Sequence, residues 1–272
     1  MKLLDPYGRR IRYLRVSVTD RCNHRCIYCM PEEGVPLKAH GDILSYEEIA
    51  RIADGAAALG FDRVRLTGGE PLVRRRIEDL VSMLAAIEGL DEVSMTTNGS
   101  LLTGEKARLL KAAGLSRINI SLDTLDPERF RAITRGGDIG AVLAGIDAAL
   151  EADLRPVKIN MIVFEETTRD DIERMRAFCN ERGLVLQTIK QFSLYEREED
   201  PANGVSCDRP QPCEMCDKLR LTADGYLKPC LFSDKEISVD LDHIELSLRK
   251  AVAAKPQKGT CCSNRLMCQI GG

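Results

Sequence analysis

The feature that most constrains this chain is a regular alternation of short apolar runs and amphipathic helical patterns over its first two thirds. Such alternation is typical of repeated βα units around a parallel sheet. Six apolar runs predict strands, at 11–18, 63–67, 92–97, 117–122, 156–164 and 184–192. Helical patterns lie between them, near 45–60, 74–87, 104–113, 138–152 and 169–182. The first of these begins with a capping box formed by Ser45 and Glu48.

Six βα units are too few for a closed eight-stranded barrel, but they can form an open one. We therefore predict an α/β fold with a partial (β/α)6 barrel, whose functional loops lie at the carboxyl ends of the strands. After Phe192 the periodicity stops, and the following stretch is polar and contains prolines. We predict a boundary there, between a partial barrel at 1–192 and a cysteine-rich region at 193–272.

Composition limits the classes of function that need to be considered. Hydrophobic residues make up 44%, charged residues 30%, and the formal charge is -3, as in an ordinary globular protein without a nucleic-acid partner. The first ten residues lack an apolar secretory segment, and no stretch approaches the roughly 18 apolar residues of a membrane span. We expect a cytoplasmic protein, in which eleven cysteines serve as metal ligands or redox groups rather than in disulfides.

Three cysteines, Cys22, Cys26 and Cys29, follow the first predicted strand with the spacing C-x3-C-x2-C. Structural zinc sites usually use four ligands in paired groups, whereas a [4Fe-4S] cluster held by three thiolates keeps one iron free for an outside ligand. The spacing favours the cluster. A zinc knuckle or three incidental thiols are the alternatives.

These cysteines in their βα context resemble the radical S-adenosylmethionine superfamily. In that superfamily the free iron binds the amino and carboxylate groups of S-adenosylmethionine, which is cleaved to a 5'-deoxyadenosyl radical that abstracts hydrogen from the substrate. The resemblance implies that Cys22, Cys26 and Cys29 hold the catalytic cluster. It also implies that Tyr28 packs near the adenine.

Three more strand ends agree with this resemblance. "TGGEP" (67–71) resembles the motif whose backbone and glutamate hold the methionine amino group, and "TTNG" (96–99) and "SLD" (121–123) match positions that bind the rest of S-adenosylmethionine. Each motif alone is equally typical of a turn, but they follow successive strands. The cofactor-binding residues implied are Gly68, Gly69, Glu70, Thr96, Asn98, Ser121 and Asp123.

A second group, Cys213, Cys216 and Cys230, has the spacing C-x2-C-x13-C. Together with "RVSVTDRCNHRCIYCMP", "RLTGGEPLVRR", "SLDTLDPERF", "LRLTADGYLKPCLFS" and the final "IGG", it resembles the GTP 3',8-cyclase family, the molybdenum cofactor biosynthesis protein A family. The resemblance implies a second [4Fe-4S] cluster, whose open iron contacts the guanine of GTP. It also implies that Gly271 and Gly272 insert toward the active site, with a flexible terminus as the alternative.

Basic residues on the strands grip GTP in that family, because guanidinium groups match phosphate oxygens in geometry and charge. Solvated surface charge is the alternative for any one of them. The matching positions are Arg15, Arg63, Arg65, Lys158, Lys218 and Arg220.

The chain departs from the family pattern in its substrate half. Gln187 and Lys190 stand where the sixth strand of the family carries an arginine and a glutamate, and Asp217 and Lys218 replace an asparagine and an arginine. The segment before Cys213 is also short. Cys207, Cys261, Cys262 and Cys268 lack a family role: one could close the second cluster, together they could hold a further cluster, or they are unligated thiols. We interpret Cys179 as a small residue of the hydrophobic core.

The leading hypothesis is a radical S-adenosylmethionine lyase that uses two [4Fe-4S] clusters and an electron donor to act on GTP or a related nucleotide. The alternative is a two-cluster paralogue acting on another nucleotide, small molecule or peptide. A third hypothesis is a zinc-stabilised regulatory protein without catalysis. Neither a nucleic acid nor a membrane is expected as partner. A homodimer is one option that the sequence leaves open.

Overall fold

A computed structural model describes residues 3–195, 208 and 211–271 of the chain. Its elements follow in the order β1 (Tyr13–Ser17), η1 (His40–Asp42), α1 (Tyr46–Ala58), β2 (Arg63–Thr67), η2 (Pro71–Val73), α2 (Ile77–Ala85), β3 (Glu92–Thr97), α3 (Gly104–Ala112), β4 (Arg117–Ser121), α4 (Pro127–Thr134), α5 (Ile139–Glu151), β5 (Val157–Val163), α6 (Arg169–Glu181), β6 (Val185–Lys190), η3 (Cys213–Met215), β7 (Lys218–Leu221), β8 (Tyr226–Lys228), β9 (Ile237–Ser238), α7 (Ile244–Ala253) and α8 (Met267–Ile270).

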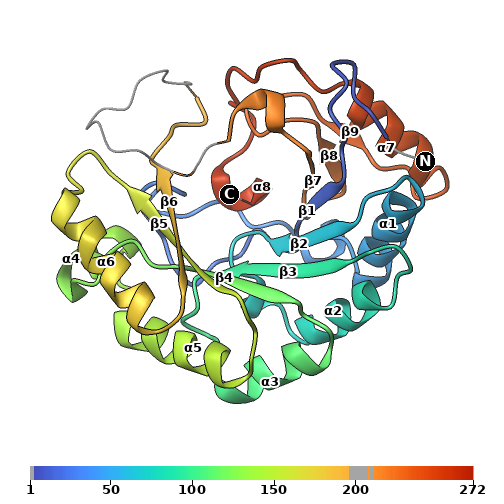
Figure 1. The fold of residues 1–272 in the computed structure, drawn as a ribbon. Coiled ribbons are helices and arrows are strands. Elements are labelled where there is room, and N and C mark those ends of the chain that lie inside the picture. Colours follow the sequence, from blue (N-terminus) through green and yellow to red (C-terminus); the bar gives the residue numbers. More distant parts are fainter. Residues whose placement is uncertain (1–2, 196–207, 209–210, 272) are drawn as a thin grey trace.

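All strands of the described residues belong to one sheet, in the order β6-β5-β4-β3-β2-β1-β7-β8-β9. The strands β1 to β6 are parallel, and each pairs with the next along the chain. Figure 1 shows them as an open arc, with α1, α2, α3, α5 and α6 along its outer side. The predicted α/β fold with a partial (β/α)6 barrel is therefore confirmed.

The predicted strands and helices match β1 to β6, α1, α2, α3, α5 and α6 to within three residues at each end. The capping box of α1 is also confirmed. Ser45 donates its backbone N–H to the Glu48 carboxylate at 2.7 Å, and the Ser45 hydroxyl accepts the Glu48 N–H at 3.1 Å. The sequence analysis missed α4, an eight-residue helix capped by Asp126, because it follows the "SLD" strand end with only a short apolar pattern.

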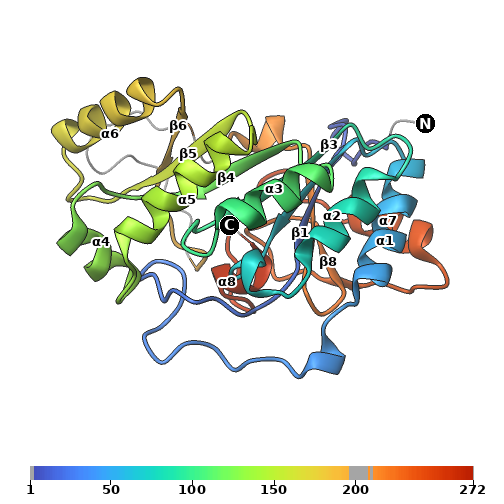
Figure 2. The same ribbon diagram turned by 90° about the horizontal axis from the view of Figure 1, so that it is seen from below.

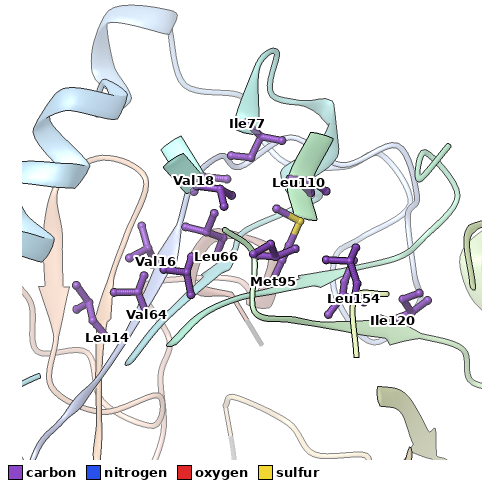
Figure 3. Close-up of a cluster of buried hydrophobic side chains, with 14 of the residues drawn as sticks. Leu14, Val16, Val18, Val64, Leu66, Ile77, Met95, Leu110, Ile120 and Leu154 are labelled. Atoms are coloured by element: carbon purple, nitrogen blue, oxygen red, sulfur yellow. The ribbon is translucent and has the colours of Figure 1, made fainter. Parts of the chain in front are cut away.

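Alternate residues of the inner strands form the core between the sheet and its helices, as Figure 3 shows for Leu14, Val16, Val64, Leu66 and Met95. Each of these side chains is 0% exposed. Burial of one such side chain stabilises the fold by about 1.5–3 kcal/mol. Because successive side chains of a strand point to opposite faces, the residues between them face the inside of the arc.

The region after residue 192 extends the same sheet. β7 lies parallel beside β1, with Tyr13 opposite Lys218 and Val16 opposite Leu221, and β8 and β9 follow as antiparallel strands. Leu219 and Leu227 belong to the same hydrophobic core as the barrel residues. The three strands have four, three and two residues, too few to show a period in the sequence. Because the sheet continues across residues 192 and 193, the boundary there remains a prediction that the two regions have different functions.

The helix α8 lies inside the arc, near the end of the chain marked C in Figure 1. Figure 2 shows α8 on the side from which the loop after β1 projects. That loop carries the first three cysteines. No helix among the described residues is both long and apolar enough to cross a membrane.

Candidate active site

The inner face of the sheet carries a row of three arginines. Arg65, Arg15 and Arg220 lie in register on the adjacent strands β2, β1 and β7. Arg65 is 7% exposed and Arg220 is 8% exposed. Burial lowers the pKa of Arg220. Removing neighbouring guanidinium groups from bulk water destabilises the folded protein, unless an anion or hydrogen-bond acceptors compensate their charge. This row is suited to an anionic ligand.

A cavity of about 280 Å³ opens over this row, and we call it the basic pocket. The three cysteines of the second group line it as well, so the structure brings them together with the basic residues. All six residues expected to bind substrate are part of its lining: Arg15, Arg63, Arg65, Lys158, Lys218 and Arg220.

Some charges of the basic pocket already have partners. Arg63 donates to the Asp217 carboxylate at 2.5 Å, and its guanidinium lies 4.9 Å from the centre of the Tyr13 ring. Lys218 donates to the Gln211 side chain at 2.7 Å. Asp217 is one of the departures from the family pattern, and it neutralises part of the positive charge on this wall.

Three uncharged residues on the wall of the basic pocket have a buried polar side-chain atom without a hydrogen-bond partner in the described part of the chain. The atoms are the Tyr13 hydroxyl, the Thr96 hydroxyl and the Asn119 side-chain oxygen. A buried polar group without a partner costs about 1–3 kcal/mol. A ligand with hydroxyl or amide groups would offset that cost. The sequence analysis missed Tyr13 and Asn119, although both lie at inward positions of predicted strands.

A buried lysine stabilises the second cysteine group. Lys255 is 3% exposed, and its ammonium lies 3.7 Å from the Cys216 sulfur while donating to the carbonyls of Lys218 and Pro229 at 2.7 Å each. Burial opposes ionisation of Cys216, but the nearby Lys255 charge holds its pKa below the ordinary value. For Cys230, burial dominates and raises the pKa. Lys255 follows α7 and showed no signal in the sequence.

A second cavity, of about 180 Å³, lies beside the first three cysteines, and we call it the cysteine pocket. Met267 and Lys190 also line it. Its lining contains ten of the residues expected at the first cluster and the cofactor: Cys22, Cys26, Cys29, Tyr28, Gly68, Gly69, Thr96, Asn98, Ser121 and Asp123. Glu70 is the remaining expected residue, and it lies behind this wall.

Glu70 is a buried carboxylate that joins the ends of β2 and β3. It is 1% exposed and accepts hydrogen bonds from the Thr97 hydroxyl at 2.6 Å, the Asn98 N–H at 2.6 Å and the Leu72 N–H at 2.9 Å. Burial raises its pKa in spite of these bonds. Glu70 forms no ion pair with a cation of the described residues, so an ammonium group of a ligand suits this position.

Two glycines let the loop after β1 approach the end of β2. A Cβ on Gly69 would lie 2.1 Å from the Arg21 carbonyl oxygen, and one on Gly68 would lie 2.5 Å from the Thr19 oxygen. Gly68 also has a φ of +135°. Only glycine fits such an approach without displacing the backbone beside Cys22.

Tyr28 and Asp123 form a buried pair across the cysteine pocket. The Tyr28 hydroxyl donates to Asp123 at 3.0 Å, and the Ile162 N–H donates to the other Asp123 oxygen at 2.8 Å. Burial raises the pKa of Asp123 to about 6. The Tyr28 ring is also in contact with the ring of Phe164, at 5.8 Å between centres. These contacts fix the orientation of an aromatic ring inside the pocket.

The first three cysteines are half-buried thiols. Burial raises the pKa of Cys22 to about 11 and that of Cys26 to about 12. For Cys29, a hydrogen bond with Cys268 and burial together raise the pKa well above its usual value. A metal ion displaces such protons on binding. Among the described residues, no three metal-binding side chains lie close enough together to hold a single metal ion. A [4Fe-4S] cluster needs no such arrangement, because each of its thiolates binds a separate iron. The three cysteines therefore fit a cluster.

The two pockets meet along a shared wall. Thr96, Asn160, Ile189 and Phe192 line both of them. Thr96 is on β3, Asn160 on β5 and Ile189 on β6, so the wall runs from the interior of the sheet to its β6 edge. A reactive group in the cysteine pocket would therefore lie next to a ligand in the basic pocket.

The surplus cysteines lie in different places. Cys262 is 0% exposed and packs with Ile270 and Phe232, Cys261 is half-buried, and Cys268 lies on α8 against Cys29. None of these three lines the basic pocket. Cys207 lies outside the described residues. Cys179, 1% exposed on α6, is a core residue as predicted.

The segment of the final glycines lies against both halves of the site. Arg220 donates to the Gly271 carbonyl, and a Cβ on Gly271 would meet the Thr67 hydroxyl at 2.0 Å. The insertion of these glycines toward the active site stays a prediction about function. Gly272 lies outside the described residues.

Comparison with known proteins identifies the family. Residues 16–179 match the Radical SAM superfamily. A GTP 3',8-cyclase from Peptoclostridium acidaminophilum is 43% identical over 281 residues, which cover 87% of this chain and 85% of the relative. One from Petrotoga mobilis is 39% identical and covers 99% of this chain and 100% of the relative. The chain belongs to the GTP 3',8-cyclase family of radical SAM proteins.

Solved radical SAM proteins share the fold of this GTP 3',8-cyclase family member. Native anSMEcpe with bound AdoMet has a TM-score of 0.66 at 14% identity and covers 90% of this chain and 81% of that chain. Streptococcus suis SuiB bound to S-adenosylmethionine has a TM-score of 0.58 at 18% identity, over 69% of this chain and 43% of that one. At these identities the likeness concerns the fold alone.

The departures from the family pattern lie in both pockets. Gln187 lines the basic pocket and Lys190 lines the cysteine pocket. The alignment with the Petrotoga mobilis relative extends over 324 residues, whereas this chain has 272, so the relative carries segments that have no counterpart here. The sequence analysis also missed Arg117 of the basic pocket, whose charge pairs with Glu92 at 2.7 Å.

Proposed function

We propose that this chain cyclises GTP to (8S)-3',8-cyclo-7,8-dihydroguanosine 5'-triphosphate, a step of molybdenum cofactor biosynthesis. The observation that carries the proposal is the shared wall between a pocket lined by three cysteines and a pocket lined by basic residues. Such an arrangement brings a radical source and a polyphosphate site into contact.

In this proposal the cysteine pocket holds the first cluster and S-adenosylmethionine. Cys22, Cys26 and Cys29 bind the cluster. Glu70 attracts the methionine ammonium, since its buried carboxylate accepts hydrogen bonds from the chain but forms no ion pair with a cation of the described residues. Tyr28 positions the adenine. When bound, the cluster and S-adenosylmethionine supply a 5'-deoxyadenosyl radical that takes a hydrogen atom from the substrate.

The remaining polar groups of the cysteine pocket bind the methionyl carboxylate and the ribose. Carboxylate, hydroxyl and amide side chains at strand ends are suited to these groups, because each can donate to or accept from an oxygen of the cofactor. We assign these contacts to Thr96, Asn98, Ser121 and Asp123, while the backbone of Gly68 and Gly69 joins Glu70 in holding the methionine amino group.

The basic pocket holds GTP. The arginine row binds the triphosphate through charge-assisted hydrogen bonds, which are shorter and stronger than neutral ones. Cys213, Cys216 and Cys230 would hold a second [4Fe-4S] cluster that supplies an iron site for the guanine, so two clusters would complete the enzyme. Residues 1–192 then generate the radical, and residues 193–272 supply the auxiliary cluster. The substrate contacts proposed are Arg15, Arg63, Arg65, Lys158, Lys218 and Arg220.

The atoms of the reaction would balance as follows. With the cofactors bound, C3' of the ribose would lose a hydrogen atom to 5'-deoxyadenosine, a C3'–C8 bond would form, and one electron and one proton would complete the ring at N7. Cleavage of S-adenosylmethionine takes a further electron. An electron donor is therefore a necessary partner.

Anaerobic turnover with S-adenosylmethionine, a reductant and GTP tests the proposal. We expect 5'-deoxyadenosine and the cyclic product in equal amounts, and we expect Cys26→Ala to abolish both. Cys216→Ala should retain the first cluster but lose conversion of GTP. Formation of 5'-deoxyadenosine without consumption of GTP would indicate the paralogue acting on another substrate. A colourless protein filled with zinc would contradict enzymatic function altogether.

A further inference from the structure

The inference concerns Cys268, a surplus cysteine that the proposed function does not use. Cys268 is 1% exposed on α8, and its thiol forms a hydrogen bond with the thiol of Cys29. It is also close enough to Cys22 for their charges to interact. The first cysteine group therefore contains four thiols, of which one comes from a segment 239 residues after Cys29.

The position of Cys268 is fixed by the contacts of α8. The Gln269 side chain accepts the Leu266 N–H at 2.9 Å, and the Gly271 N–H donates to the Met267 carbonyl at 3.0 Å. Arg220 donates to the Gly271 carbonyl. Ile270 is 0% exposed in a small apolar cluster with Leu194 and Phe232. A cysteine held on both sides in this way is part of the site rather than an incidental thiol of a loose segment.

The neighbouring residue ties Cys268 to the cofactor side. Met267 lines the cysteine pocket, and α8 packs against β1, the strand that precedes the first three cysteines. A ligand that fills the cysteine pocket up to Met267 would therefore contact α8. A shift of this short helix would change both the access to the pocket and the distance between the fourth thiol and the other three.

We propose that Cys268 is a fourth thiolate donor to the first iron-sulfur site, binding the iron that Cys22, Cys26 and Cys29 leave open, until S-adenosylmethionine replaces it. This proposal rests on the proposed function for the presence of the cluster. Its chemical basis is that three thiolates leave one iron of a [4Fe-4S] cluster without a protein ligand, and such an iron is the one most readily lost. A fourth thiolate within reach would retain it.

The exchange of ligands needs no redox partner. The thiolate of Cys268 leaves the iron and takes up a proton, while the amino and carboxylate groups of S-adenosylmethionine fill the coordination site. Cys268 therefore protects the cluster from loss of iron when no cofactor is bound. Because S-adenosylmethionine must displace Cys268 to bind, its affinity for the enzyme is lower than it would be without this cysteine.

Iron content in a set of variants tests this proposal without measuring turnover. Cys29→Ala leaves three thiols, Cys22, Cys26 and Cys268, so we expect it to keep the iron and sulfide content of the wild-type protein after anaerobic reconstitution. Cys29→Ala combined with Cys268→Ala should lose roughly four irons per chain, the content of one cluster. The matched control combines Cys29→Ala with Cys179→Ala, which removes an equally buried thiol on α6 and should lose none.

Electron paramagnetic resonance provides a second test. It compares the wild-type protein with Cys268→Ser, a variant that changes the size of the side chain very little. Mild oxidation with ferricyanide removes the open iron from a three-thiolate cluster and leaves a paramagnetic [3Fe-4S] cluster. We expect Cys268→Ser to show about one more such spin per chain than the wild-type protein, in the absence of S-adenosylmethionine.

Equal spin counts in the wild-type protein and Cys268→Ser would overturn the proposal. Equal iron contents in Cys29→Ala and in Cys29→Ala combined with Cys268→Ala would also overturn it. Reconstituted wild-type protein separates this failure from failure of the proposed function. If it carries clusters and cyclises GTP while the variants show no effect of Cys268, only the inference is wrong. If it binds no iron, both are wrong.

Discussion

At the scale of single residues, Gly69 shows how one missing side chain positions the first cysteine group. The loop after β1 lies so close to Gly69 that a Cβ there would overlap the Arg21 carbonyl at 2.1 Å. That overlap involves backbone atoms, which cannot rotate away as a side chain can. The geometry of the loop that presents Cys22 therefore depends on a glycine that lies 47 residues later in the sequence.

We expect Gly69→Ala to destabilise the protein by about 1–3 kcal/mol, the usual cost of overpacking, and to weaken iron binding because Cys22 is displaced. Gly41→Ala is the matched control, since nothing lies within 4 Å of a Cβ at that position. Urea denaturation and iron analysis of both variants check this. A Gly69→Ala protein with wild-type stability and iron content would show that the loop adapts.

Lys255 has an effect on the second cysteine group that can be measured separately. Its ammonium is within 3.7 Å of the Cys216 sulfur and is almost fully buried. A hydrogen bond to a charged group contributes about 1.5–3 kcal/mol, so we expect Lys255→Met to lower the iron retained at the second site while sparing the first. Lys250→Met on the exposed face of α7 serves as the control. Unchanged iron retention in dilution against a chelator would contradict this role.

At the scale of elements, helix caps and buried ion pairs hold the framework of the site. α6 begins with a capping box in which the Asp171 carboxylate accepts the Thr168 N–H at 3.0 Å and also pairs with Arg129 of α4 at 3.0 Å. One carboxylate thus fixes the start of α6 and its contact with α4. Although burial opposes ionisation, these hydrogen bonds hold the pKa of Asp171 well below its usual value.

The sign of the resulting pH dependence follows from that depressed pKa. The contribution of Asp171 is fully present above the pKa of the unfolded chain, about 3.9, and is lost as the pH falls through the lower pKa of the folded protein. We expect Asp171→Asn to cost about 0.5–2 kcal/mol at pH 7 and less as the pH falls below 4. Urea denaturation between pH 3 and pH 7 measures this, with the exposed Asp170→Asn as control. A pH-independent difference would contradict the ionic origin.

The ion pairs of Arg265 hold the segment that leads into α8. Arg265 forms a two-pronged pair with Glu236 at 2.8 and 2.9 Å and a further pair with Asp224 at 2.9 Å, and its side chain is 10% exposed. Without Arg265, Glu236 would keep its pair with Lys228 and Asp224 its pair with Lys38, so we expect Arg265→Ala to cost about 1.5–3 kcal/mol, the usual worth of hydrogen bonds to charged groups. Arg249→Ala, which breaks an exposed pair with Glu245, should cost about 0.2–1 kcal/mol. Equal thermal stability of the two variants would contradict this difference.

At the scale of the whole molecule, the sheet makes the two regions interdependent. β7 covers the edge of β1, and residues of both regions share one hydrophobic core. A protein cut after residue 192 would expose that edge, which favours aggregation. We expect the 1–192 fragment to be insoluble or to unfold without cooperativity, as measured by soluble yield and near-ultraviolet circular dichroism. A soluble, cooperatively unfolding fragment would instead support two independent domains.

The sequence predicted β1 to β6 because each is long enough to show an apolar period and is followed by a helical pattern. It predicted the two cysteine groups because their spacing is local. It could not predict β7 to β9, whose pairing with β1 is a long-range contact between very short strands. The sequence marked Cys268 as a surplus cysteine but could not show its contact with Cys29, and Lys255 near Cys216 was missed, because only the folded chain brings these distant residues together.

The wall shared by the two pockets has one more consequence. Thr96, Asn160, Ile189 and Phe192 separate the pockets only in part, so a nucleotide seated in the basic pocket would itself cover the opening between them. The bound substrate would then close this opening and exclude water and buffer molecules from the 5'-deoxyadenosyl radical in the cysteine pocket. A poorly fitting nucleotide would leave a gap, and S-adenosylmethionine would be spent without any product being formed.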